Sequence, residues 1–108
     1  MRQYIIDELR PDAVRRVREY LDNHCEKSDL DNLYWLQIPD DMLSPDQYTH
    51  KDCQPHCSGI ELGERFLCFE LLVRSRTSLK CNCIAYATPQ QRRFILSFAD
   101  RLCEETDI

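Results

Sequence analysis

Cysteine and histidine side chains gather in two short segments of the sequence. The first is HKDCQPHC at residues 50–57, and the second is CNC at residues 81–83. Structural zinc sites use four cysteine or histidine ligands, commonly one close pair from each of two segments. Here the first pair would be Cys53 with either His56 or Cys57, and the second pair would be the two cysteines of the second segment. The spacing permits a zinc site, provided that the fold brings the two segments together.

The second pair has a favourable geometry if it lies on a strand. Residues two apart on a strand point to the same face with Cα atoms about 6.5 to 7 Å apart, so Cys81 and Cys83 could reach one ion. The pattern is not specific for zinc, because the chain has no C-x2-C pair and no H-x3-H element. The competing interpretation is that both cysteines face the core as small hydrophobic residues, and that residues 52–57 are a loop entering a strand.

Redox chemistry is a third interpretation of the first segment. Residues 53–57, Cys-Gln-Pro-His-Cys, are similar to the Cys-Pro-His-Cys motif of periplasmic disulfide oxidoreductases, where the dithiol starts a helix of a thioredoxin fold. Gln54 is additional and changes the separation of the thiols. The residues after Cys57 favour a strand, so the helix N-terminus that would lower a thiol pKa is missing. We therefore do not infer the family's activity from this similarity.

Length and composition predict one folded domain that holds these segments. The chain has 108 residues, of which 43% are hydrophobic and 31% are charged. This balance is typical of a folded protein with a single core, and we expect one α+β domain over residues 1–108. We find no internal repeat and no linker-like change of composition.

Charge and cysteine content restrict the partners and the compartment. The formal net charge of -5 repels phosphate backbones and anionic membranes, which argues against nucleic-acid and membrane partners. Seven cysteines are an odd number, so a complete set of internal disulfides is excluded. The first residues turn acidic too soon for a signal-peptide core, and we expect a cytoplasmic protein with reduced thiols.

Two segments have the periodicity of helices. Pro11 suits the first position of a helix, and Val14, Val17 and Leu21 then recur on one face. The second helix follows Thr88, which forms a capping box with the glutamine three residues later. Its apolar stripe consists of Phe94, Ile95, Phe98 and Leu102.

The residues between these helices favour strands. Residues 33–39 are short, aromatic and bounded by proline, while residues 58–62, 65–73 and 79–87 read as a three-stranded antiparallel meander. The strand at residues 33–39 joins this meander, which gives a sheet of about four strands. Packed against the two principal helices, the sheet predicts a two-layer α+β sandwich. A capping-box pattern at residues 44–47 predicts a short helix just before the first cysteine and histidine segment.

Basic residues surround the loop between the last two predicted strands. Arg74, Arg76 and Lys80 lie beside several hydroxyl groups and could hold a phosphate or a nucleic-acid backbone. A solvated hairpin loop uses the same residue types, and the acidic net charge favours that simpler interpretation.

The sequence lacks the common catalytic motifs. The chain has no Gly-rich phosphate loop, no G-x-S-x-G elbow and no H-E-x-x-H helix, so an enzymatic activity is unsupported.

If the helices leave one face of the sheet uncovered, that face would expose an apolar patch too large for a monomer. A symmetric dimer would then bury it. The residues expected on this face are Phe66, Leu72, Ile84 and Tyr86.

Two functional hypotheses follow from the sequence. The first is a non-catalytic interaction or accessory module that binds a protein partner or a second copy of itself. The alternative is a small zinc-binding protein, with zinc as the only cofactor that the sequence suggests. The predicted ligands are Cys53, His56, Cys57, Cys81 and Cys83.

Overall fold

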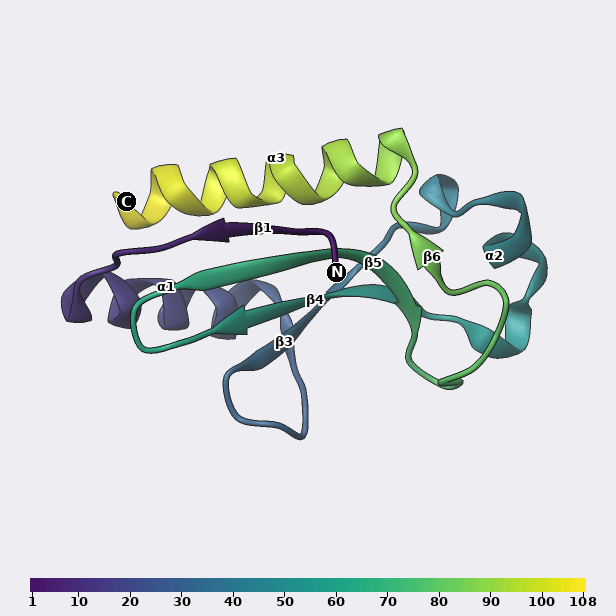
Figure 1. Ribbon diagram of the computed structural model, residues 1–108, viewed down its shortest axis with the longest axis horizontal. Coiled ribbons are helices and arrows are strands. Elements are labelled where there is room, and N and C mark those ends of the chain that lie inside the picture. Colours follow the sequence, from purple (N-terminus) through teal and green to yellow (C-terminus); the bar gives the residue numbers. More distant parts are fainter.

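A six-stranded antiparallel sheet and two long helices form the protein (Figure 1). The computed structural model describes residues 1–108. In chain order the elements are β1 (Gln3–Ile6), α1 (Pro11–His24), β2 (Glu26–Lys27), β3 (Leu33–Gln37), the 3₁₀ turn η1 (Asp40–Met42), α2 (Pro45–Thr49), the 3₁₀ turn η2 (Lys51–Cys53), β4 (His56–Leu62), β5 (Leu67–Ser75), β6 (Ala85–Tyr86) and α3 (Pro89–Thr106). The α+β sandwich predicted from the sequence is confirmed, with more strands than the four expected.

The strands follow the order β1-β5-β4-β3-β2, and β6 pairs with β5 beyond the end of β1. The predicted meander of β4, β5 and β6 is present, with β3 on the outer side of β4. The two additional strands are β1 and β2 at the edges. Each has only two to four residues, which is too few for a period of two to stand out in the sequence.

One hydrophobic core of 17 buried residues joins the helices to one face of the sheet. On β5 the alternating residues Leu67, Phe69, Leu71 and Val73 all point into this core, as predicted. From α1 the core receives Ala13, Val17 and Leu21, while Val14 is only partly buried. From α3 it receives Ile95, Phe98, Ala99 and Leu102. The helices fall short of the length and hydrophobicity that a bilayer-spanning helix needs.

Both predicted capping boxes are present. At the start of α2, the Ser44 hydroxyl accepts a hydrogen bond from the Gln47 backbone N–H, and the Gln47 side chain accepts one from the Ser44 N–H. Thr88 and Gln91 repeat this arrangement at the start of α3. These boxes satisfy backbone N–H groups that a helix start otherwise leaves unpaired, which explains why both helices begin where the sequence indicated.

The prediction that Cys81 and Cys83 lie on a strand is wrong. Only Ala85–Tyr86 pairs with β5, and residues 81–83 form a turn, closed by a hydrogen bond from the Ile84 N–H to the Cys81 carbonyl. β1 occupies the same edge of β5 along Leu67–Glu70, and β6 joins it only at Leu72 and Val73. The chain therefore meets the sheet only briefly before α3 begins.

The face of the sheet that points away from the core has no helix over it. Trp35, Leu33 and Ile84 are only partly buried there. The apolar patch expected on this face differs in composition from the prediction. Phe66 packs against Gly63 in the β4–β5 loop, and the guanidinium of Arg2 covers the ring of Tyr86 at 4.5 Å from its centroid.

Candidate metal centre

Three cysteine thiols converge at the end of the sheet where α2 and β6 lie (Figure 1). The Sγ atoms of Cys53, Cys81 and Cys83 all lie within 4.8 Å of one another. In a tetrahedral site with Zn–S bonds of about 2.3 Å, two sulfur ligands are about 3.8 Å apart. Small side-chain adjustments would therefore place all three thiols around one ion.

Cys53 is held at the end of η2 by contacts on both sides. Its N–H donates to the carbonyl of His50 at 3.0 Å, and its own carbonyl accepts a hydrogen bond of 2.6 Å from the Ser75 hydroxyl at the end of β5. Next to it, the Thr77 hydroxyl donates to the carbonyl of Asp52 at 2.7 Å. The segment before β4 is thus fastened to the end of β5, although the two are far apart in sequence.

The turn at residues 81–83 is positioned by the starts of two helices. The side-chain amide of Gln47 donates to the carbonyl of Cys83 at 3.2 Å. The same residue accepts a hydrogen bond of 2.8 Å from the side chain of Gln91, which also donates to the carbonyl of Met42 at 2.9 Å. Gln47 and Gln91 are almost completely buried. The two capping boxes are therefore joined to each other, and one of them fixes the backbone beside Cys83.

His56, at the first position of β4, lies beside one of the three thiols, that of Cys83. Its side chain is 1% exposed, and its Nε2 lies 3.3 Å from the Sγ of Cys83. A tetrahedral zinc site separates a nitrogen and a sulfur ligand by about 3.6 Å, so this distance suits two ligands of one ion. Burial, together with the neighbouring His50, lowers the pKa of His56. The imidazole is thus held in the neutral form that binds metals.

The Nδ1 atom of His56 is a buried nitrogen without any hydrogen-bond partner. Buried polar atoms without a partner are rare because they lose hydration without compensation. Hydrogen bonding within the chain thus accounts for Nε2, which faces the Cys83 thiol, and leaves Nδ1 unsatisfied.

Cys57, the alternative to His56 in the first pair, points to the opposite face of the sheet. It is opposite Arg74 in the β4–β5 ladder, and its environment includes Arg76 and Glu26. Burial raises the pKa of its thiol to about 11. Adjacent residues on a strand face opposite ways, so only one of the two could join the cluster. The structure brings His56 to the Cys83 thiol and leaves Cys57 among the side chains of the other face.

Cys81 carries the thiol of the cluster that ionises most readily. Its pKa is lowered to about 7, first by the N–H of Cys83, whose nitrogen lies 3.5 Å from its Sγ, and then by the thiols of Cys83 and Cys53. Burial raises the pKa of Cys83 to about 12, and the hydrogen bond with Cys81 raises the pKa of Cys53. A divalent cation would replace the remaining thiol protons, since thiolates are the forms that bind metal.

The predicted anion-binding residues each have a different environment. Arg74 forms an ion pair with Glu70 at 2.9 Å, and Arg76 forms one with Glu26 at 2.6 Å. Lys80 lies exposed in the segment before the 81–83 turn. Because carboxylates compensate both arginines, this arrangement gives an anion site no support, and anion binding stays a prediction.

Gln47 and Gln91 are the functional residues that the sequence did not single out. The local pattern reveals each capping box, but it reveals neither the bond between the boxes nor the contact with Cys83. The sequence signal that could have revealed these contacts is the residue type. Glutamine, unlike glutamate, can accept a hydrogen bond with its oxygen while its amide donates to another group.

The candidate donors are the three clustered thiols, with the His56 imidazole beside Cys83 as the nearest candidate for a fourth ligand. Four such ligands fill a tetrahedral coordination shell and leave no position for a substrate, which is the arrangement of structural zinc sites. Thiolate and imidazole donors favour zinc over magnesium or calcium, which prefer oxygen. No protein-family model matches the chain, and no curated protein or solved structure shows significant similarity to it.

Proposed function

We propose that the protein is a small accessory module that binds one zinc ion through Cys53, His56, Cys81 and Cys83. The observation that carries the proposal is the convergence of the Cys53, Cys81 and Cys83 thiols from two distant segments. We place the protein in the cytoplasm, a reducing compartment that keeps thiols available as ligands.

The proposed ion has a structural role. It links the segment before β4 to the turn before β6, two irregular segments at the same end of the sheet. A closed four-ligand shell supplies no open coordination position, so the ion stabilises the fold instead of activating water or a substrate. The free energy of metal binding then adds to the free energy of folding.

The proposal is tested by metal content and by cobalt substitution. We expect the purified protein to hold about one equivalent of zinc, and its Co²⁺ form to show the visible bands of a tetrahedral thiolate site. Cys53→Ser and Cys81→Ser should lose the metal and these bands. Cys103→Ser is the matched control, because Cys103 is a partly buried cysteine on α3 outside the cluster. Metal binding that survives Cys53→Ser and Cys81→Ser, or a wild-type protein that binds no Zn²⁺ or Co²⁺, would contradict the proposal.

The interaction hypothesis is compatible with this metal role. A structural zinc ion holds a scaffold, and a scaffold without catalytic groups acts through its surfaces. The surface that favours this second function is the uncovered face of the sheet.

A further inference from the structure

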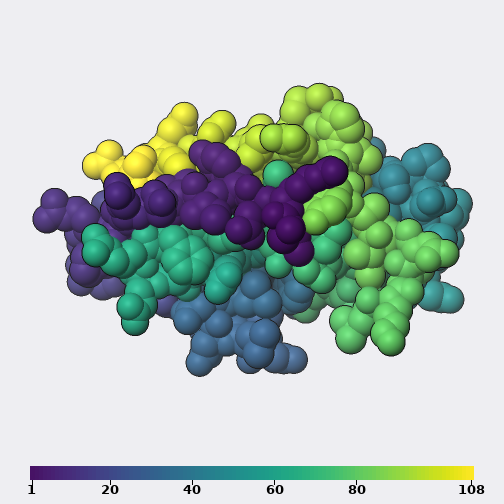
Figure 2. Space-filling model, in the orientation of Figure 1, coloured from purple at the N-terminus to yellow at the C-terminus, as the bar shows by residue number.

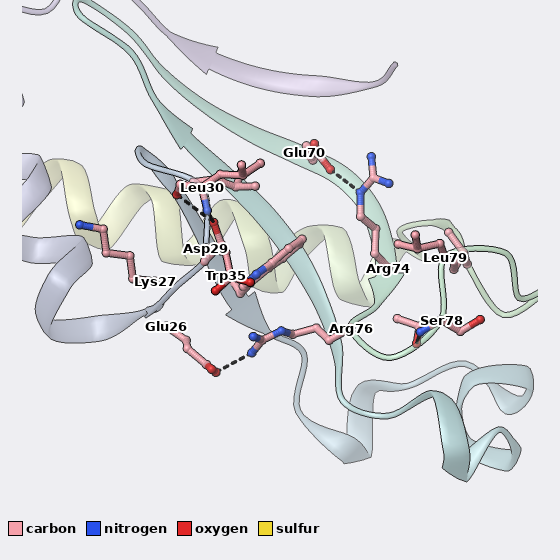
Figure 3. A pocket seen from close by; sticks show the side chains of 14 residues that line it. Glu26, Lys27, Asp29, Leu30, Trp35, Glu70, Arg74, Arg76, Ser78 and Leu79 are labelled. Atoms are coloured by element: carbon pink, nitrogen blue, oxygen red, sulfur yellow. Dashed lines mark hydrogen bonds and ion pairs between the residues drawn. The ribbon is translucent and has the colours of Figure 1, made fainter.

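A groove of about 590 Å³ runs across the uncovered face of the sheet (Figure 3). Trp35 of β3 lies at its centre, with Arg76 beside it, and Leu30 and Leu79 lie on opposite sides. The loop that carries Leu30 and the loop that carries Leu79 both protrude from the molecule, the first in blue and the second in green in Figure 2. The groove is thus a recess bounded by two projecting loops.

Large apolar side chains at the groove have few contacts within the chain. Leu79 is 92% exposed and Leu30 is 66% exposed. Leu33, Trp35 and Ile84 are partly buried between them. Exposed leucines on both sides of an aromatic recess are typical of a surface that another protein covers.

The charges of the groove suit a second copy of this chain. Its lining has three acidic and three basic side chains, which sum to zero on a molecule with a net charge of -5. A nucleic acid would find no net positive charge there. A second copy would meet a surface that does not share the repulsive charge of the whole molecule.

The two rims of the groove have opposite charge. The β2 rim carries Glu26, Lys27 and Asp29, a sum of -1, and the β5 rim carries Glu70, Arg74 and Arg76, a sum of +1. Arg76 pairs with Glu26 across the groove, whereas Arg74 binds Glu70 through its Nε and points its two other nitrogens away from this carboxylate (Figure 3). In a two-fold arrangement whose axis runs along the groove, the acidic rim of one protomer faces the basic rim of its partner. The same rotation brings the projecting loop of each protomer to the recess of the other.

We propose that this groove is the self-association surface of the protein and that its occupant is a second copy of the chain. Leu79 of each protomer enters the groove of its partner beside Trp35, and the opposed rims pair Asp29 of one protomer with Arg74 of the other. Every side chain in these contacts lies outside the cysteine cluster, so separate substitutions can remove the dimer contacts and the proposed zinc ligands.

The first experiment measures self-association by sedimentation equilibrium across the micromolar range. We expect a reversible dimer whose dissociation constant increases at least tenfold in Leu79→Glu. This substitution does not disturb folding, because the side chain is almost fully exposed. Ile108→Glu, which alters an exposed apolar residue far from the groove, should leave the dissociation constant unchanged. A wild-type chain that stays monomeric, or a dimer that tolerates Leu79→Glu, overturns the proposal.

A charge exchange tests the two-fold arrangement. In a homodimer of Asp29→Lys the introduced lysine faces Arg74, and in a homodimer of Arg74→Glu the introduced glutamate faces Asp29. Each variant alone should therefore dimerise at least tenfold more weakly. Mixed in equal amounts they should form a heterodimer of nearly wild-type affinity, since the introduced lysine then faces the introduced glutamate, and the unchanged Arg74 faces the unchanged Asp29. Dimers of the single variants that are as strong as the heterodimer contradict this arrangement. Zinc content, measured in the same samples, reports separately on the metal proposal.

Discussion

Cys81 differs from the other six cysteines in the direction of its pKa shift. Burial or a neighbouring thiol raises the pKa of every other cysteine, whereas the pKa of Cys81 is lowered to about 7. The largest cause is the N–H of Cys83 within the 81–83 turn. A large share of this residue is therefore thiolate near neutral pH.

The metal-free protein should show this difference in its reactivity with iodoacetamide. The reactive species is the thiolate, so alkylation of Cys81 should increase with pH around a midpoint near 7. Cys25 is also partly exposed, but burial raises its pKa to about 12, and it should react much more slowly. Peptide mass spectrometry over a series of pH values measures both. Equal rates for the two cysteines would contradict the assignment. Of these two, only Cys81 should be protected by zinc.

A second residue-scale prediction separates His56 from Cys57. His56→Ala removes a proposed ligand, and we expect the zinc affinity to fall by more than about a hundredfold, which exceeds the usual effect of losing an outer-shell partner. Cys57→Ala changes the adjacent buried residue on the opposite face and should leave the affinity within a few fold. Competition with a chromophoric chelator measures both constants. The proposed ligand set would be wrong if Cys57→Ala had the larger effect.

At this scale the sequence identifies the members of the cluster but cannot choose among them. Residue type and spacing group Cys53, Cys81 and Cys83, and the structure does bring their thiols together. The choice between His56 and Cys57 depends on which face of β4 points toward the turn. That orientation is set by the pairing of β4 with β3 and β5, which is information about distant residues.

The element that organises the cluster end is the pair of joined helix starts. Gln47 and Gln91 each close a capping box, and the hydrogen bond between their side chains connects α2 with α3. Because both side chains are buried, every polar atom that they present to the interior needs a partner.

Gln91→Glu tests this connection. The carboxylate can still accept from the Thr88 N–H, but it cannot donate to the Met42 carbonyl or to Gln47. We expect the free energy of unfolding to fall by about 1 to 3 kcal/mol, the usual effect of leaving buried polar groups unsatisfied. Gln90→Glu is the matched control, because this neighbour is exposed and a negative charge near a helix start is tolerated. Urea unfolding of both variants measures the difference, and equal midpoints would contradict the role of the connection.

The predictability of the elements depends on their length and on local signals. Capping boxes and apolar stripes locate α2 and α3, because those signals lie within a few residues of each other. The sequence predicts a strand where the structure has the turn at residues 81–83, because cysteine, asparagine and isoleucine alternate there as they would on a pleat. In the antiparallel register of β6, Cys83 would lie opposite Ser75 at the very end of β5, and the chain forms a turn there instead.

At the scale of the whole molecule, zinc should behave as a folding ligand. A ligand that binds only the folded chain, present at about a hundred times its dissociation constant, adds about 2.7 kcal/mol to the stability. For a chain of 108 residues this corresponds to an increase in Tm on the order of 10 °C. Thermal unfolding followed by circular dichroism, with zinc and with a chelator, measures the shift. Cys53→Ser should show none, and an identical Tm under both conditions for the wild type would count against a structural ion.

The segment from residue 76 to residue 84 has two roles in the structure. It supplies Cys81 and Cys83 to the cluster, and it places Leu79 and Ile84 at the groove. Two binding events that order the same segment are thermodynamically coupled, and the coupling is reciprocal: zinc tightens dimerisation by the factor by which dimerisation tightens zinc binding. A chelator should accordingly remove zinc more easily from a dilute solution of the protein than from a concentrated one. The apparent metal affinity would thus become a reporter of how many copies of the chain are assembled.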